Sequence, residues 1–284
     1  MSFAETALLG ALAGFTIYLG LPVARLELVS ARTRVALAMF SVGVLVFLLV
    51  DVLGHGFEIA EEAVAEFEAG EVGFGKAAGL SLLLLGGFGL GSAGLGILER
   101  RLRRQSSLPP VAGGSTDVLT VADHHQLSSP SAARSRALHT GVMIAIAIGV
   151  HNLAEGLAIG VSAQSGEIGL ATVLVIGFAL HNATEGFGIV GPLGDIRPSW
   201  RWLGLVGLIG GAPTFIGSMV GYHVTSEPLE LVFYSLAGGA ILYVIGEIWH
   251  GMRRHGYREL GLIMLAVGFA AGVLTDLVVV YGGG

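Results

Sequence analysis

The sequence has no cysteine, which excludes disulfide bonds and thiolate metal sites. It is also poor in charge: Asp, Glu, Lys and Arg make up 13% of its 284 residues, against about 25% in an ordinary soluble domain. Hydrophobic residues make up 53% of the chain, and the mean hydropathy is +0.78. This composition is typical of an integral membrane protein.

Eight long apolar runs account for that hydropathy. They lie near residues 5–24, 35–54, 77–98, 137–163, 168–193, 202–224, 229–250 and 259–281. Each is about as long as the roughly 20 residues that a membrane-spanning helix requires. None alternates apolar and polar residues as the strands of a membrane barrel do. We therefore predict an all-α polytopic protein of the cell (inner) membrane, with eight transmembrane helices in a single domain, 1–284.

The basic residues predict the orientation of these helices. Of the 15 Lys and Arg residues, 14 fall in the connections after the first, third, fifth and seventh runs, and only Lys76 falls elsewhere. The connection after the second run carries glutamates instead. Cytoplasmic loops of membrane proteins collect Lys and Arg. We therefore expect these four connections to be cytoplasmic and both termini to be extracytoplasmic.

The longest polar segment, 99–136, separates the third and fourth runs. It is rich in Ser, Pro and Gly and contains the pair His124-His125. Such a composition is typical of a flexible linker. We expect a flexible cytoplasmic loop, in which the two histidines either bind metal or are incidental.

Two copies of one polar motif interrupt the fourth and fifth runs: HNLAEG at 151–156 and HNATEG at 181–186. In each copy His and Glu are four residues apart and so share one face of a helix. The helical rise places His151 and His181 roughly 18–20 Å below the outer surface. Two antiparallel helices would therefore bring two His and two Glu together near the bilayer midplane.

Ionisable groups at that depth need compensation, because each costs at least ~2.5–3.5 kcal/mol to insert. A divalent cation such as Zn²⁺, Fe²⁺ or Mn²⁺ supplies it, since imidazole nitrogens and carboxylate oxygens are its ligands. Buried His–Glu ion pairs between two helices are the alternative.

The paired motif resembles that of the ZIP (Zrt/Irt-like) divalent-metal transporters, most closely the bacterial type with HNxPEG in the fourth and fifth helices. The resemblance extends over the whole chain, and it implies a ZIP-like bundle, a histidine-containing loop after the third helix and a homodimer. It implies that the central metal site uses His151, Glu155, His181 and Glu185, with Asn152 and Asn182 able to complete a second metal position.

The resemblance also implies a route through the membrane. Asp51 and His55, four residues apart near the outer end of the second run, match residues at the extracellular mouth, although an interfacial pair is the alternative. Glu247 matches a glutamate near the cytoplasmic end of the seventh helix. His250, on the same helical face, could form a cytosolic exit site with Glu247, His124 and His125.

Two departures from the family pattern stand out. Ala154 and Thr184 occupy positions that commonly carry proline, so the kinks that those prolines would produce are either absent or made in another way. Ala212 precedes Pro213 where many relatives have Glu-Pro, which removes one ligand of a second metal. We therefore expect a mononuclear site or a weakened binuclear one.

The function that we predict is secondary transport of divalent metal toward the cytosol by alternating access. Zinc is the favoured substrate, with iron, manganese or cadmium as others, and no cofactor, nucleic-acid partner or enzymatic activity is expected. Three alternatives stay open: an intramembrane zinc hydrolase, a haem-binding electron carrier and a metal-binding sensor that does not transport. The first lacks the HExxH motif of zinc proteases.

Overall fold

A computed structural model describes residues 1–26, 30–106, 130–166, 168–223, 226–253 and 256–281. This part of the chain is 90% helical and contains no strand. Within it, eight helical stretches are long and apolar enough to cross a membrane. The predicted all-α architecture with eight transmembrane helices is therefore confirmed.

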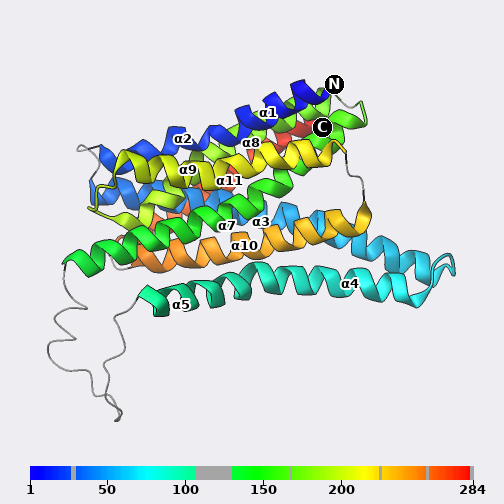
Figure 1. Cartoon of the computed structure of the whole chain (residues 1–284), viewed down its shortest axis with the longest axis horizontal. Coiled ribbons are helices and arrows are strands. Elements are labelled where there is room, and N and C mark those ends of the chain that lie inside the picture. The colour runs from blue at the N-terminus through cyan, green and yellow to red at the C-terminus, as the bar shows by residue number, and fades with distance from the viewer. Residues whose placement is uncertain (27–29, 107–129, 167, 224–225, 254–255, 282–284) are drawn as a thin grey trace, which may run out of the picture.

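The helices follow the eight apolar runs in order (Figure 1). The first span comprises α1 (Phe3–Phe15), α2 (Ile17–Gly20) and the 3-10 turn η1 (Leu21–Arg25), and the second is α3 (Ala31–Glu68). The third joins α4 (Phe74–Gly89), the π-helical turn η2 (Leu90–Gly94) and α5 (Leu95–Ser106). The others are α7 (Pro130–Gln164), α8 (Ile168–Val190) with η3 (Gly191–Leu193), α9 (Trp200–Gly221), α10 (Glu227–Arg253) and α11 (Arg258–Tyr281).

Serine caps begin three of these helices. The side chains of Ser2, Ser30 and Ser199 accept hydrogen bonds from the backbone N–H three residues ahead. At Ser2 the bond is reciprocal, because Glu5 accepts from the Ser2 N–H. Each cap satisfies a backbone donor that the first helical turn leaves free.

Both ends of the polar segment 99–136, which we predicted to be a loop throughout, are helical. Helix α5 continues to Ser106 and α7 begins at Pro130. The Leu, Glu and Arg residues of 95–104 favour helix even in water, and proline is favoured at a first helical position. Residues 107–129, with His124 and His125, lie outside the described residues.

Helix α7 lies inside the bundle, packed mainly against α9 and also against α8 and α10 (Figure 1). Helix α3 packs against α10 and α11. Glycines set the close approach of α7 to α9: a Cβ atom on Gly149, Gly156 or Gly160 would lie 2.1–2.4 Å from a backbone oxygen of α9. The motif-bearing helix is thus held directly against the main chain of its neighbour.

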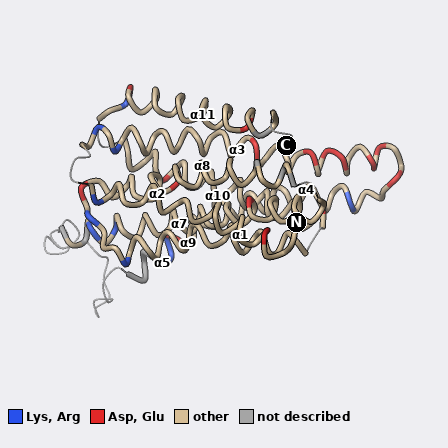
Figure 2. The backbone as a smooth tube through the Cα atoms, turned by 90° about the horizontal axis from the view of Figure 1, so that it is seen from above, with Lys and Arg blue, Asp and Glu red and all other residues tan. Residues whose placement is uncertain are grey.

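Charge separates toward opposite ends of the bundle (Figure 2). The described arginines gather at one end, here called the arginine end, and glutamates line the hairpin between α3 and α4 at the other, the acidic end. Lys76 lies within this hairpin, where its Nζ is 2.8 Å from Glu66 and 3.4 Å from Glu227. The N-terminus and the last described turn of α11 lie toward the acidic end.

Candidate metal centre

The two repeated motifs meet in the interior of the bundle, on the neighbouring helices α7 and α8. All six of their polar side chains are buried, with exposed fractions of 0–7%: His151, Asn152, Glu155, His181, Asn182 and Glu185. Residues between the motifs form the connection that reverses the chain, so the two copies run in opposite directions at the same level. The structure therefore brings the two motifs together, as the sequence predicts.

His151 is the residue that joins the two motifs. Its Nε2 lies 3.1 Å from Oε1 of Glu155, one turn along α7, and 3.8 Å from Oε1 of Glu185 on α8. His181 lies beside this group and interacts electrostatically with both His151 and Glu155. The Phe47 and Phe178 rings flank it, each with its centroid 6.5 Å from the imidazole.

Buried atoms without a hydrogen bond concentrate at this place. They include both ring nitrogens of His151 and His181, both carboxylate oxygens of Glu155, Oε1 of Glu185 and Oδ1 of Asn152. A buried polar atom left without a partner costs about 1–3 kcal/mol, and more when it is charged. These nitrogen and oxygen atoms are of the kinds that bind Zn²⁺ and similar cations, so the donor set fits a divalent metal.

The side chains do not form a finished coordination sphere. Among the residues that the structure describes, no group of three or more His, Asp or Glu side chains is arranged closely enough to hold a metal ion. The imidazole of His151 instead rests against the two carboxylates at ion-pair distances. Side-chain rotations within the buried group are therefore needed before three ligands can share one ion.

The two asparagines have a different environment from the histidines and glutamates. Asn152 Nδ2 has three acceptors within hydrogen-bond distance, which share its two N–H groups: Asn182 Oδ1 at 2.5 Å, the Gly210 carbonyl at 2.9 Å and Glu185 Oε2 at 3.2 Å. Asn182 Nδ2 donates to the Ala13 carbonyl at 3.2 Å. Their amide nitrogens thus bond to protein atoms on α8, α9 and α1.

Asp51 and His55 lie on α3 on the side of the centre toward the acidic end. The His55 ring stacks on Tyr234 at 5.5 Å, its Nδ1 is 3.5 Å from Glu58, and its side chain is 53% exposed. Asp51 is less exposed and interacts electrostatically with His55 on one side and with His151 and Glu155 on the other. The two residues therefore occupy a line from solvent to the centre.

Asp276 on α11 is a further member of this line, which the sequence did not reveal. It interacts electrostatically with Asp51 and with His181. The contacts between α11 and α3 place it there: Gly268 lies against Phe40 and Gly272 against Phe47, and Asp276 comes one turn later on the same face. The only signal in the sequence is one acid within an otherwise apolar transmembrane run.

The structure describes two of the four predicted exit residues. Glu247 is half-buried and His250 is exposed, both near the arginine end of α10. His124 and His125 lie outside the described residues. The grouping of these four residues stays a prediction.

Both motif helices are continuous through the positions where the family commonly has proline. Helix α7 runs without a break through Ala154, and α8 runs through Thr184, whose hydroxyl bonds back to the His181 carbonyl at 2.8 Å. Pro213 lies inside α9, one residue after Ala212. The side chain at 212 is a methyl group, so α9 supplies no carboxylate there.

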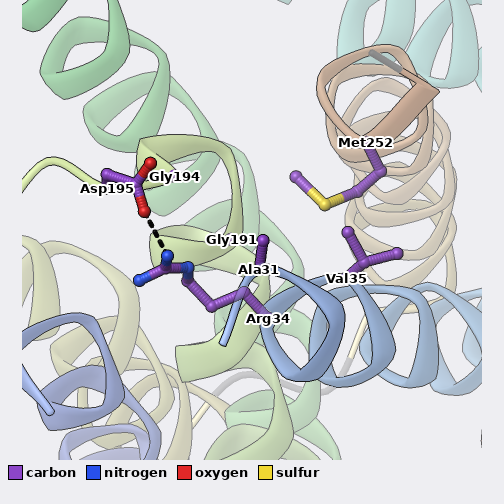
Figure 3. Close-up of a pocket in the computed structure, with 7 residues that line it drawn as sticks. All are labelled: Ala31, Arg34, Val35, Gly191, Gly194, Asp195 and Met252. Atoms are coloured by element: carbon purple, nitrogen blue, oxygen red, sulfur yellow. Dashed lines mark hydrogen bonds and ion pairs between the residues drawn. The ribbon is translucent and has the colours of Figure 1, made fainter. Parts of the chain in front are cut away.

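An ion pair between Arg34 and Asp195 lies outside the two motifs, and Figure 3 shows it in close-up. The Arg34 guanidinium on α3 contacts the Asp195 carboxylate, in the connection that follows α8 and η3. These residues line a cavity of about 10 Å³ together with Val35, Gly191 and Met252. The pair connects the helix that carries Asp51 with the end of the helix that carries the second motif.

Two comparisons with known proteins bear on this centre. The sequence model of a family described as "ZIP Zinc transporter" matches residues 103–271, which contain both motifs. Zinc transporter ZIPB of Bordetella bronchiseptica (strain ATCC BAA-588 / NCTC 13252 / RB50) is 26% identical over 168 residues. The aligned part is 56% of this chain and 52% of that protein, so the chain spans about half the length of the curated relative that it matches.

Proposed function

The chain belongs to the ZIP zinc transporter family, and on that premise we propose that it carries divalent metal ions, zinc foremost, across the membrane. His151, Glu155, His181 and Glu185 are the proposed ligands of the central site. Iron, manganese and cadmium are further candidate substrates, because all of them accept the same nitrogen and oxygen ligands.

One observation carries this proposal: two antiparallel helices direct two imidazoles and two carboxylates at one buried place, and most of their polar atoms make no hydrogen bond. If the four side chains served only as structural ion pairs, each imidazole would pair with a carboxylate, as His151 does with Glu155. Here His181 makes no hydrogen bond with either ring nitrogen. A cation that binds in this group would satisfy atoms from both motifs at once.

We further propose that the metal travels from the acidic end to the arginine end, which faces the cytosol. The charge separation supports this orientation, since arginines collect on the cytoplasmic side of membrane proteins. The line from His55 and Asp51 to the centre supplies the outer half of the route. A buried midplane site that opens to each side in turn is the arrangement that alternating access requires.

The alternatives receive less support. A zinc hydrolase needs an open coordination position, a water molecule and a general base at the metal, but it does not need acids placed along a path to one surface. A haem carrier would leave Glu155 and Glu185 buried without a role. A sensor that binds metal without moving it differs from a transporter only in transport, so transport itself is what must be measured.

The experiment is uptake of radioactive ⁶⁵Zn²⁺ into proteoliposomes that contain the purified protein. The test variant is His181→Ala/Glu185→Ala. The matched control is His223→Ala/Glu259→Ala, which removes one exposed His and one exposed Glu far from the motifs.

We expect saturable uptake by the wild type and by the control, and none by the test variant. Zinc that binds tightly in detergent but never enters the vesicles would refute transport and favour the sensor or the hydrolase. Uptake by the test variant at the wild-type rate would refute the assignment of the site.

A further inference from the structure

Asparagine occurs only twice in the 284 residues, at positions 152 and 182, and both copies are completely buried in the centre. Each follows a motif histidine directly. On a helix the next residue points about 100° away from its predecessor. The asparagines therefore face the helices that flank the motifs, and their hydrogen bonds run to those helices.

The identity of the Asn152 atom that makes these bonds follows from its neighbours. It faces the Gly210 backbone carbonyl, which accepts hydrogen bonds and cannot donate them. The atom must therefore be the amide nitrogen. The same logic fixes Asn182, whose nitrogen faces the Ala13 carbonyl and whose oxygen faces Asn152.

We propose that Asn152 and Asn182 are positioning residues and not metal ligands, and that they form an amide clamp which holds Glu185 in place and ties α1, α7, α8 and α9 together. The clamp consists of the two asparagine side chains, Glu185 Oε2 and the carbonyls of Gly210 and Ala13. The inference rests on the proposed function, because it assigns roles within the same metal centre.

The clamp separates the atoms of the centre that are hydrogen-bonded to protein from those that stay free to bind a metal ion. Glu185 Oε2 accepts from Asn152, whereas Glu185 Oε1 has no hydrogen bond and lies 3.8 Å from His151 Nε2. The bond to Oε2 thus turns Oε1 toward the proposed ligands. Both amide nitrogens are occupied by protein acceptors, and a nitrogen that carries two hydrogens has no lone pair to offer a cation.

One bound metal ion per chain follows from this division. A second ion would need oxygen ligands on the side of Glu185 where the amide hydrogens lie. Asn182 Oδ1 is already bonded there at 2.5 Å, and α9 presents Ala212 without a carboxylate. The hydrogens of the clamp supply to Glu185 Oε2 the positive partner that a second cation would otherwise supply.

Asn152 Oδ1 is the clamp atom that has no hydrogen bond, and its role decides between the two assignments. Replacing asparagine by aspartate separates them, because a carboxylate keeps this oxygen and is a stronger metal ligand than an amide, but cannot donate a hydrogen bond when ionised. If Asn152 were a ligand, Asn152→Asp would bind zinc as tightly as the wild type or more tightly.

If Asn152 is instead a clamp residue, the aspartate that replaces it faces three acceptors and has no hydrogen to donate to them. We expect the zinc affinity of Asn152→Asp to fall by about tenfold or more, as measured by isothermal titration calorimetry.

Asn182→Asp is the matched comparison, since it makes the same chemical change at the equivalent position of the other motif. The oxygen that accepts from Asn152 is kept, and the Ala13 carbonyl still accepts from the Thr16 hydroxyl at 2.6 Å. We expect this variant to lose less zinc affinity than Asn152→Asp. Gln164→Glu, an exposed amide at the end of α7, controls for added charge.

The melting temperature of the metal-free protein in EDTA gives a readout that does not depend on transport or on zinc. We expect Asn152→Asp to lower it, and Asn152→Asp/Glu185→Gln to recover part of the loss. The reason is that the introduced glutamine amide can donate to the introduced aspartate and restore the bond with reversed polarity. Recovery of folded protein by the double variant, where the single variant does not fold, counts as the same result.

Three outcomes would overturn the clamp: undiminished zinc binding by Asn152→Asp, a double variant no more stable than the single one, or two zinc ions bound per wild-type chain. Failure of the proposed function has a different signature. In that case the wild type takes up no zinc, while the stability pattern of the metal-free variants stays as predicted.

Discussion

Substitution of Gly156 by alanine is the sharpest test of how the motif is held in the bundle. A Cβ atom at this position would lie 2.1 Å from the Thr214 carbonyl oxygen and 2.9 Å from the Ser218 nitrogen on α9. Ordinary contact begins at 3.4 Å, so the oxygen is 1.3 Å too close. Both neighbours are backbone atoms, which cannot rotate away, and α7 and α9 must therefore separate.

The cost can be given as a free energy of unfolding. Forcing an extra carbon atom into a well-packed interior destabilises by about 1–3 kcal/mol. A loss of 1 kcal/mol lowers the melting temperature of a chain of this size by about 2–4 °C. Glu155 precedes Gly156, and metal–ligand distances tolerate shifts of only about 0.2 Å. We expect a clear fall in melting temperature and a loss of zinc affinity of about tenfold or more.

The assay compares thermal unfolding and zinc titration of Gly156→Ala with those of Gly86→Ala. Gly86 on α4 has no atom within 4 Å of its hypothetical Cβ. That control should melt at or slightly above the wild-type temperature, because alanine favours helix over glycine by about 0.5–1 kcal/mol. If Gly156→Ala melts like the control and keeps its zinc affinity, the close packing of α7 on α9 does not support the centre.

Three further predictions follow from the same structure. Lowering the pH from about 7.5 to about 5.5 should weaken zinc binding by up to about tenfold per pH unit for each ligand that must lose a proton. Zinc titrations at a series of pH values measure this change, and a pH-independent affinity would argue against histidine ligands. Arg34→Ala should change the uptake rate by no more than about fivefold, because the Asp195 side chain is 93% exposed and such pairs contribute about 0–1 kcal/mol; a loss of about a hundredfold would show that the pair has another role. Asp276→Asn should raise the zinc concentration at half-maximal uptake and leave the maximal rate nearly unchanged, because it removes a carboxyl group beside Asp51 and His181 on the outer part of the proposed route. An unchanged half-saturation would place Asp276 outside that route.

The eight helices and the meeting of the two motifs could be predicted because both depend on local rules. Length and hydropathy define each span, and the four-residue spacing puts His and Glu on one face. The two motifs lie at similar distances from the turn that separates them, which fixes their common level. None of these inferences depends on the position of a third helix.

The ends of the loop at 99–136 were wrong for a physical reason. Charged residues show that a segment is solvated, but a solvated segment can still be helical. Leu95–Ser106 is such a helix. Asp276 could not be found because its partners come from α3 and α8, far away in the chain. The role of the asparagines likewise depends on where the main chains of α1 and α9 lie.

The first motif illustrates why glycine accompanies the polar residues. His151 and Glu155 point to the centre, Asn152 donates to the Gly210 carbonyl, and Gly156 lies against the Thr214 carbonyl. The last two contacts are both with the main chain of α9. The amide and the missing side chain thus attach α7 to one neighbour, while the imidazole and carboxylate remain directed at the centre.

The second motif makes the same attachments to a different neighbour. Asn182 donates to the Ala13 carbonyl at the end of α1, and a Cβ on Gly186 would lie 2.5 Å from the Ile17 carbonyl of α2. The repeat therefore has two parts with separate purposes. His and Glu provide the atoms that a cation can bind, and Asn and Gly attach each copy to main-chain atoms of a different helix. For this reason, exchanging the asparagines of the two motifs for aspartate should give unequal effects, although the motifs look equivalent in sequence.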